Sequence, residues 1–439
     1  MTAHDWFAIS LVLGGLLLVV GAVHMYTQRN SYPPEVPRKT VHVALGLICS
    51  VFPWIFASPL PVWILAALAS VPILAIRLVP PLKAALGHVL HGIKRPSYGE
   101  ILFAPAVATV FHLAGENKIL HLVPILILTL ADATGAIAGT RWGKHAYSAG
   151  SGFKSIEGSL GFLLVAFPCC FLPLWLGNAA GIGSAIWIAL ILATLAMMAE
   201  GFSDRGFDNI ILPIGCFFVL ERLLPLEIPS LAGRFIVLVL LLALVLTGSR
   251  WSSLSGAALL GSAMLGYGCA ILADWRYALP PVAVFICHVF TTRKHDLTHN
   301  FQHRLDVVIS HAIACLPWVL ACALSAITPA VGLAGISLAM ANQLALLDHS
   351  TRRRTGQKNR PARSLAKGLL FAAAPGLILL GIDPRLLILP MALNILATSL
   401  LLPLNTRAGI ALETKHSSGL WFGKGLASLA ASLPALLLL

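Results

Sequence analysis

The sequence has few charged residues, and acidic residues are the scarcer of the two kinds. Only 11% of its 439 residues are charged, with 17 acids against 30 lysines and arginines. A soluble globular domain carries about 25% charged residues, so this composition excludes an ordinary soluble fold. The eight cysteines lie in apolar segments without the spacing of a metal site or a disulfide framework. We interpret them as small core residues.

In place of charge the chain has long apolar runs, such as Trp6–Val23 and Phe235–Leu246. A helix crosses a bilayer with about 20 apolar residues. The runs are nearly continuous and lack the period-two alternation of membrane β-strands. We therefore predict an all-α fold, a polytopic transmembrane helical bundle. No cationic leader precedes the first run, which we expect to be a retained span.

Hydropathy predicts about sixteen spans, beginning near residues 6, 41, 60, 99, 119, 159, 181, 207, 235, 255, 277, 306, 329, 365, 385 and 419. With the N-terminus outside, most of the 30 basic residues fall on one side, which the positive-inside rule makes cytoplasmic. This predicts a multi-pass protein of a bacterial inner membrane. The net charge of +13 then faces anionic lipids, and we expect no nucleic-acid partner.

The most polar segment of the first half begins at Asp132, directly after an apolar run. An acid near the membrane interior is a functional candidate, and magnesium is usually held by one or two carboxylates plus substrate phosphates. Gly135, Gly139 and Gly143 recur every four residues. This spacing fits either close helix packing or backbone approach to a phosphate chain.

Cations follow these glycines. Arg141, Lys144 and Lys154 are suited to clamp a triphosphate, although flanking cytoplasmic charge is the alternative. Ser155 is predicted to cap the next helix, and Glu157 fits its first turn. A cation opposes the positive end of a helix, so this cap leaves Lys154 unexplained. We interpret Lys154 as a phosphate ligand. Glu157 would either hold a metal or orient Lys154.

The motif Asp132-Ala-x-Gly-x-x-x-Gly-x-x-x-Gly-Lys144, followed by Lys154-Ser-x-Glu-Gly-Ser159, resembles the nucleotide-binding signature of the polyprenol kinase family. This family includes dolichol kinase and phytol kinase and is related to phosphatidate cytidylyltransferases. Further segments of the resemblance, which covers about residues 30–220, are Arg38-Lys-x-x-His-x-x-x-Gly46, Glu200–Pro213 and, more weakly, Arg95–Glu100. The Gly-His-Gly-Gly-like segment of the cytidylyltransferase branch is absent after Gly158, which favours a kinase.

The resemblance implies transfer of the γ-phosphate of CTP to a long-chain isoprenoid alcohol, with Mg²⁺ or another divalent cation. It implies catalytic roles for Asp132, Lys154, Glu157 and Asp208, and metal ligation by Asp132, Asp204 and Asp208. Glu200 is either part of this site or a boundary charge. The residues implied to bind nucleotide or metal are Gly135, Gly139, Arg141, Gly143, Lys144, Ser155, Gly158, Asn209, Arg38, Lys39 and His42. The alternatives are a cytidylyltransferase that forms a CDP-lipid, and a transporter of lipids or small molecules.

Residues 1–230 are predicted to form the catalytic domain. Residues 231–439 are predicted to form a second helical membrane domain, either a diverged repeat or one that resembles a phytyl-phosphate kinase. His295, His299 and His303 lie four apart on one predicted helix face, which fits zinc binding or a solvated helix extension. The sequence leaves open whether copies of the chain form a homo-oligomer.

Overall fold

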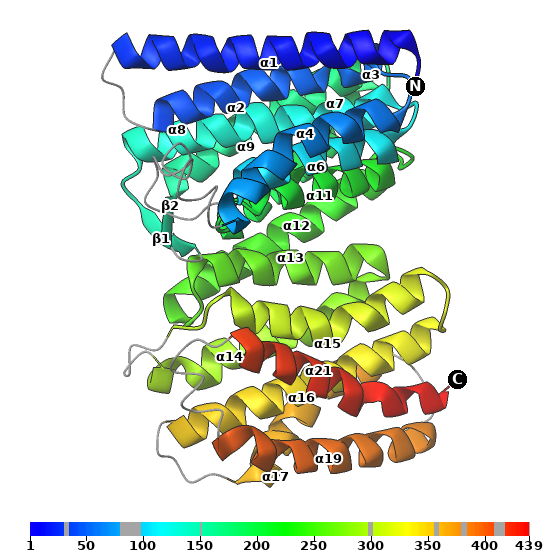
Figure 1. Ribbon diagram of the computed structural model, residues 1–439. Helices are drawn as coiled ribbons and strands as arrows, with labels where there is room; N and C mark the ends of the chain where they lie inside the picture. The colour runs from blue at the N-terminus through cyan, green and yellow to red at the C-terminus, as the bar shows by residue number, and fades with distance from the viewer. Residues whose placement is uncertain are drawn as a thin grey trace. The chain divides into compact units, whose positions relative to one another are not determined.

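The computed structural model describes residues 1–29, 35–79, 98–149, 152–296, 302–354, 360–378, 384–407 and 418–438. Helices dominate this part of the chain (Figure 1), and nine of them are long and apolar enough to cross a membrane. The all-α, polytopic prediction is confirmed. Each expected span begins close to the start of a helix, while the count of sixteen and the outside N-terminus stay predictions.

The chain divides into two compact units, Met1–Ile236 (unit 1) and Val237–Leu439 (unit 2). Unit 1 begins with α1 (Ala3–Arg29), α2 (Glu35–Ser50), α3 (Phe52–Ile55), α4 (Pro59–Leu78) and α6 (Gly99–Ala114). It continues with α7 (Lys118–Leu126), the π-helical turn η1 (Ile127–Ala131), α8 (Asp132–Trp142), β1 (Ala146–Ala149), β2 (Gly152–Ser155), α9 (Ile156–Leu176), α10 (Ile182–Phe202), α11 (Asp208–Leu223) and the start of α12 (Ile228–Gly248).

Side-chain caps fix the starts of two helices in unit 1. The side chain of Asn117 accepts hydrogen bonds from the backbone N–H groups of Ile119 and Leu120 at the start of α7. Ser155 Oγ accepts from Gly158 N at 3.1 Å, so Ser155 caps α9 as predicted. These caps satisfy N–H groups that have no partner within the helix.

The prediction lacked the antiparallel hairpin of β1 and β2, which connects α8 to α9. Its register pairs Ala146 with Ser155 and Tyr147 with Lys154. In Figure 1 the hairpin lies at one end of α8 and α9. Because Ser155 is both the last residue of β2 and the cap of α9, the hairpin fixes Lys154 at the entrance to that helix.

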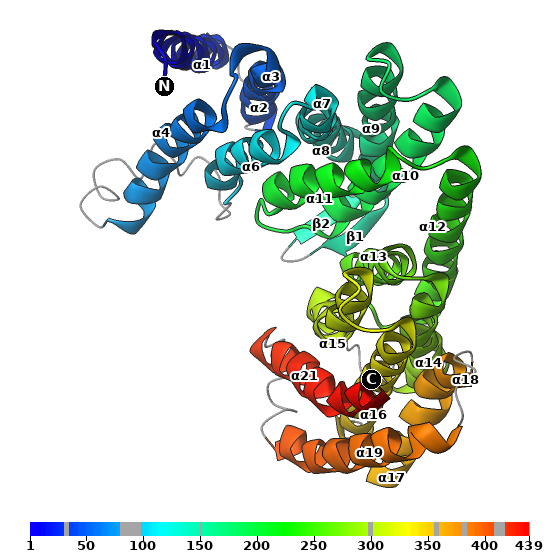
Figure 2. The same ribbon diagram turned by 90° about the vertical axis from the view of Figure 1, so that its right-hand side faces the viewer.

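Unit 2 is built around α16 (Pro329–Arg354), which Figure 2 shows among its other helices. In the apolar window of α16, 94% of the residues are buried, against 17–56% in the other candidate spans, so α16 is the core of this unit. The remaining elements are η2 (Ser249–Trp251), α13 (Gly256–Leu272), η3 (Trp275–Ala278), α14 (Leu279–Asp296), α15 (Leu305–Ala323), α17 (Pro361–Gly368), η4 (Leu369–Ala373), α18 (Ala374–Ile378), α19 (Pro384–Arg407), α21 (Ser418–Ser432) and η5 (Leu433–Leu438).

The histidine face predicted for the second half is not a continuous helix. Helix α14 ends at Asp296, and His303 instead forms an isolated β-bridge with Leu254. His303 is buried, and its ring lies edge-on to those of His288 and Trp421. His299 and the side chain of His295 lie outside the described residues. The interpretation of His303 as part of a solvated helix is therefore wrong.

Candidate functional site

Asp132 is the first residue of α8 and is buried against α2. Lys39 Nζ donates to Asp132 Oδ2 at 2.6 Å, and both side chains are only 6% exposed. His42 Nε2 lies 3.4 Å from the same carboxylate oxygen and 3.1 Å from the carbonyl oxygen of Leu128. Lys39 and His42, both from the motif at residues 38–46, therefore contact Asp132, the predicted catalytic acid.

The spacing of this segment explains the contact. Lys39, His42 and Gly46 lie three and four residues apart, on one face of α2. A Cβ at Gly46 would overlap the side chain of Thr129 in η1, so the glycine lets the two helices touch. The π-helical turn directly before Asp132 interrupts regular α-helical bonding, and such turns are frequent at functional sites. The hydroxyl of Thr129 is buried and has no hydrogen-bond partner among the described residues.

Lys154 is held by an acid from a different helix. Its Nζ donates to Glu200 Oε1 at 2.6 Å and also contacts the Glu200 carbonyl oxygen. Burial disfavours the ammonium charge, but the carboxylates of Glu200 and Asp208 outweigh it and raise the pKa of Lys154 above its ordinary value. Lys154 is therefore a cation throughout the neutral range.

The glycines of α8 pack against α9 and also line a cavity. A Cβ on Gly158 would lie 2.9 Å from the carbonyl oxygen of Gly135 and 3.1 Å from Gly139 Cα, so the two helix backbones are in direct contact. The cavity beside this contact has a volume of about 400 Å³. The packing interpretation of the glycine spacing is therefore confirmed, whereas backbone approach to a phosphate chain stays a prediction for the glycines that line the cavity.

The cavity is bounded by cations and by hydroxyl groups. Its charged lining residues are Arg38, Lys154 and Glu200, and Thr140, Ser155 and Ser159 contribute hydroxyl groups. The first turn of α9 borders it, and the N-terminal end of a helix favours anions. Asp132 does not line the cavity; it lies one turn before Gly135, which does. The remaining lining residues are Gly135, Ala136, Gly139, Gly143, Ala146, Phe153 and Gly158.

Asp208 and Asn209 follow a tight turn between α10 and α11. Arg205 and Gly206 have positive φ angles of 55° and 84°, which reverse the chain there. The backbone N–H of Tyr98 donates to the Arg205 carbonyl at 2.8 Å, which ties the start of α6 to this turn; Arg95 lies outside the described residues. The turn brings Asp208 within electrostatic range of Asp132 and Lys154.

Three predicted residues have other contacts than those expected. Glu157 accepts from the backbone N–H of His145, and its Oε1 lies 2.7 Å from His145 Nδ1, so Glu200 and not Glu157 is the partner of Lys154. Arg141 and Lys144 are exposed and do not line the cavity, and Arg141 stacks on Trp142. The reason is the hairpin, which turns the chain after Gly143 and presents Lys154 in their place.

The carboxylates do not form a complete metal site on their own. Within the described ranges no three His, Cys, Asp or Glu side chains gather as ligands, so Asp132, Asp204 and Asp208 do not form one cluster. Asp204 instead accepts from the backbone N–H of Arg205 at 2.9 Å. Asn209 Oδ1 is buried and accepts no hydrogen bond from any described residue, so this oxygen remains available.

Fold and site together define a polytopic helical membrane protein with a cationic, glycine-lined cavity beside a buried acid. The chain is 28% identical over 220 residues to "Phytol kinase" of Synechocystis sp. (strain ATCC 27184 / PCC 6803 / Kazusa), an alignment that covers 48% of this chain and 88% of that protein. This relative confirms the resemblance to the polyprenol and phytol kinase family. No family model matches the sequence, and no solved structure matches it.

Proposed function

We propose that this chain is a kinase that transfers the γ-phosphate of CTP to a long-chain isoprenoid alcohol, of the polyprenol or phytol type, within the membrane. The observation that carries the proposal is the cavity of about 400 Å³, with Lys154 and Arg38 in its lining and the Lys39–Asp132 pair one turn away. The similarity to a phytol kinase supports the same reaction class.

Phosphoryl transfer needs positioning and charge neutralisation more than covalent participation by the protein. Lys154 and Arg38 supply fixed positive charge inside the cavity, and the N-terminus of α9 adds oriented N–H groups. Glu200 holds the Lys154 ammonium in place before the nucleotide enters. Preorganised charge of this kind stabilises the transition state without reorganisation during the reaction.

In the proposed step the alcohol oxygen forms a bond to the γ-phosphorus, and the bond from that phosphorus to the bridging β–γ oxygen breaks. CDP leaves with the electron pair of the broken bond. The alcohol proton passes to a carboxylate, for which we propose Asp208, because it acts electrostatically on both Asp132 and Lys154. The products are an isoprenyl monophosphate and CDP.

The donor set fits a magnesium ion that arrives with the nucleotide. Asp132 and Asp208 offer two carboxylates and the unpartnered Asn209 Oδ1 an amide oxygen. Magnesium is usually bound by one or two carboxylates together with substrate phosphates, so a third carboxylate is not required. When bound, the ion would neutralise charge on the β- and γ-phosphates. Lys39 would then exchange its contact with Asp132 for a phosphate oxygen.

The proposal also includes the membrane orientation. We place the N-terminus outside, about sixteen spans across a bacterial inner membrane, and the cavity on the cytoplasmic side, where CTP is found. An impermeant maleimide is expected to label Asn178→Cys in intact cells and Lys144→Cys only after permeabilisation; both positions are exposed. The reverse pattern would overturn this orientation.

The reaction is tested with CTP labelled at either the γ- or the α-phosphate, purified protein in nanodiscs, and phytol or polyprenol. We expect the γ-label in a lipid monophosphate and the α-label only in CDP. Entry of the α-label into lipid would establish the cytidylyltransferase alternative. Movement of phytol between leaflets without any labelled product would instead support a transporter.

A further inference from the structure

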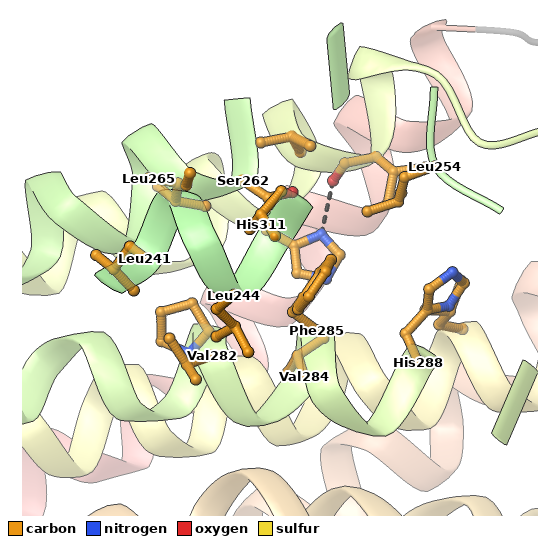
Figure 3. A pocket seen from close by; sticks show the side chains of 17 residues that line it. Leu241, Leu244, Leu254, Ser262, Leu265, Val282, Val284, Phe285, His288 and His311 are labelled. Carbon is orange, nitrogen blue, oxygen red and sulfur yellow. Dashed lines mark hydrogen bonds between the residues drawn. The ribbon is translucent and has the colours of Figure 1, made fainter. Parts of the chain in front are cut away.

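Unit 2 contains a pocket that is separate from the cavity described in unit 1. It is lined from α12, α13, α14 and α15, with single contributions from Leu254 and from Leu347 of α16. Its volume is about 60 Å³, several times the roughly 10–15 Å³ that one water molecule needs. In Figure 3 the aliphatic side chains of Leu241, Leu265 and Val282 lie toward one side, and His288 toward the other.

The lining is almost wholly hydrocarbon. Leucine, valine, proline, alanine and Phe285 side chains form the walls, and the polar side chains among the described lining residues are Ser262, His288 and His311. None of these lining residues is acidic, lysine or arginine. A cavity with such walls excludes water and favours an apolar guest. Of its lining helices, α12 and α15 are long and apolar enough to span a bilayer and α13 and α14 are shorter apolar helices, which makes a lipid chain the accessible guest.

The polar groups suit a hydroxyl head better than a charged one. His311 Nδ1 donates to the Val307 carbonyl at 2.6 Å, so the other nitrogen of a neutral His311 is an acceptor. The hydroxyl of Ser262 is anchored to the Ala258 carbonyl at 2.8 Å and retains acceptor capacity. Both groups are acceptors, and an alcohol has one O–H to donate, for which the ring nitrogen of His311 is the stronger acceptor. A phosphate would be buried there without a lysine or arginine partner, which is strongly unfavourable.

We propose that unit 2 binds the head-proximal part of a single-chain lipid alcohol in this pocket, with the hydroxyl donating to His311. That the chain is an isoprenoid rests on the function proposed for unit 1. The chain would then bind two molecules of its substrate, one at each unit. The pocket accommodates only the start of a long chain, whose remainder extends between helices into lipid.

Two glycines of α13 provide a matched pair of variants. Gly266 lines the pocket, and a Cβ there makes only ordinary contact with Leu241, at 3.6 Å, so a leucine would project into the space. Gly268 lies two residues further on, where an added Cβ meets nothing within 4 Å. Gly266→Leu should fill the pocket, and Gly268→Leu should control for a leucine on the same helix.

The experiment uses the full chain in nanodiscs, with tritiated phytol for stoichiometry and a diazirine analogue of phytol for peptide mapping. We expect two phytol molecules per chain, with cross-links in both units. Gly266→Leu should reduce the binding to one and lower unit 2 labelling at least tenfold, whereas Gly268→Leu should retain both. His311→Leu should weaken unit 2 labelling, and His311→Gln, which keeps an acceptor, should partly restore it.

Several outcomes would overturn the proposal: no unit 2 cross-links in the wild-type chain, equal labelling of Gly266→Leu, or equal competition by the hydrocarbon phytane. Stronger competition by phytyl monophosphate would overturn the choice of head group. The wild-type mapping does not depend on any variant folding. If phytol is never phosphorylated yet labels unit 2 in a Gly266-dependent way, the kinase proposal fails and this one stands.

Discussion

Each unit buries a carboxylate paired with cations, and the two pairs differ in what surrounds them. In unit 1, Asp132 is held by Lys39 and His42, and the next turn of α8 lines a cavity. In unit 2, Asp348 accepts from Arg352 at 2.9 Å and from Ser364 and Lys367 at 2.7 Å, so both of its oxygens are occupied. Burial of the two acids is nearly the same.

The comparison shows that a buried ion pair is not in itself evidence of function. Structural networks bury charge too, and they do so by satisfying each acceptor. The pair in unit 1 is distinguished by its surroundings: a backbone-lined cavity and the unpartnered Asn209 oxygen. We therefore propose a catalytic role for Asp132 and a structural role for Asp348.

The strongest test of this distinction neutralises Asp132 and Asp348 in separate variants. Asp132→Asn removes the charge proposed to hold magnesium and should lower kcat about a thousandfold. Asp348→Asn leaves Arg352 and Lys367 without their anion and should destabilise the protein by about 3–5 kcal/mol, with kcat of the folded protein unchanged. Initial rates with γ-labelled CTP and denaturant unfolding in detergent measure the two effects. Equal loss of kcat in both variants would refute the assignment.

Lys154 in unit 1 and Lys367 in unit 2 allow the same comparison, with a smaller expected effect on the reaction rate. Lys154→Gln should lower kcat/KM for CTP about a hundredfold, because a charge-assisted contact to phosphate is lost. Lys367→Gln is the matched change in unit 2, and it should leave kcat/KM near wild type while lowering the unfolding midpoint. Varying CTP at saturating phytol provides both constants. An unchanged KM and kcat in Lys154→Gln would remove Lys154 from the site.

Glu200 is proposed to act through Lys154, so its neutralisation should have a more modest effect. Glu200→Gln should lower kcat/KM for CTP about tenfold. In the Lys154→Gln background the same change should add little, because its only route of action is already gone. A double-mutant cycle on kcat/KM measures this coupling. Additive losses would mean that Glu200 has a role independent of Lys154.

Glu157→Gln should have the smallest effect, less than about threefold on kcat, because exposed pairs contribute little. Its described contacts go to His145 rather than into the cavity. Steady-state rates at saturating CTP and phytol test this, with His145→Ala as a companion that removes the same pair. A loss comparable to that of Asp132→Asn would restore the catalytic role predicted for Glu157 from its motif.

The sequence predicted much of the fold because hydropathy acts over whole segments. The lack of charge, the apolar runs and the loops between them located the helices from α1 to α21. The motif at 38–46 was identified by resemblance alone, and the structure supplies the physical reason for each of its spaced residues. Ser155 was predicted as a cap because capping depends on a few adjacent residues.

Contacts between distant segments were less predictable. The pairing of Lys154 with Glu200 depends on how α10 packs against α9, and no local pattern encodes it. The hairpin was missed because its strands have only four residues each, too short for a periodic signal. The π-helical turn contains Thr129, whose side chain packs on Gly46 from a distant segment of the sequence. Its only sequence sign was an acid directly after an apolar run.

The π-helical turn η1 places the Asp132 carboxylate beside Lys39 of α2. Each residue advances an α-helix by 100°. The way in which η1 accommodates its extra residue therefore determines the direction in which the side chains of α8 point. If η1 adopted regular α-helical geometry with all five of its residues, Asp132 would rotate by about 100° away from Lys39. The π-helical turn therefore keeps Asp132 of α8 in phase with Lys39 of α2.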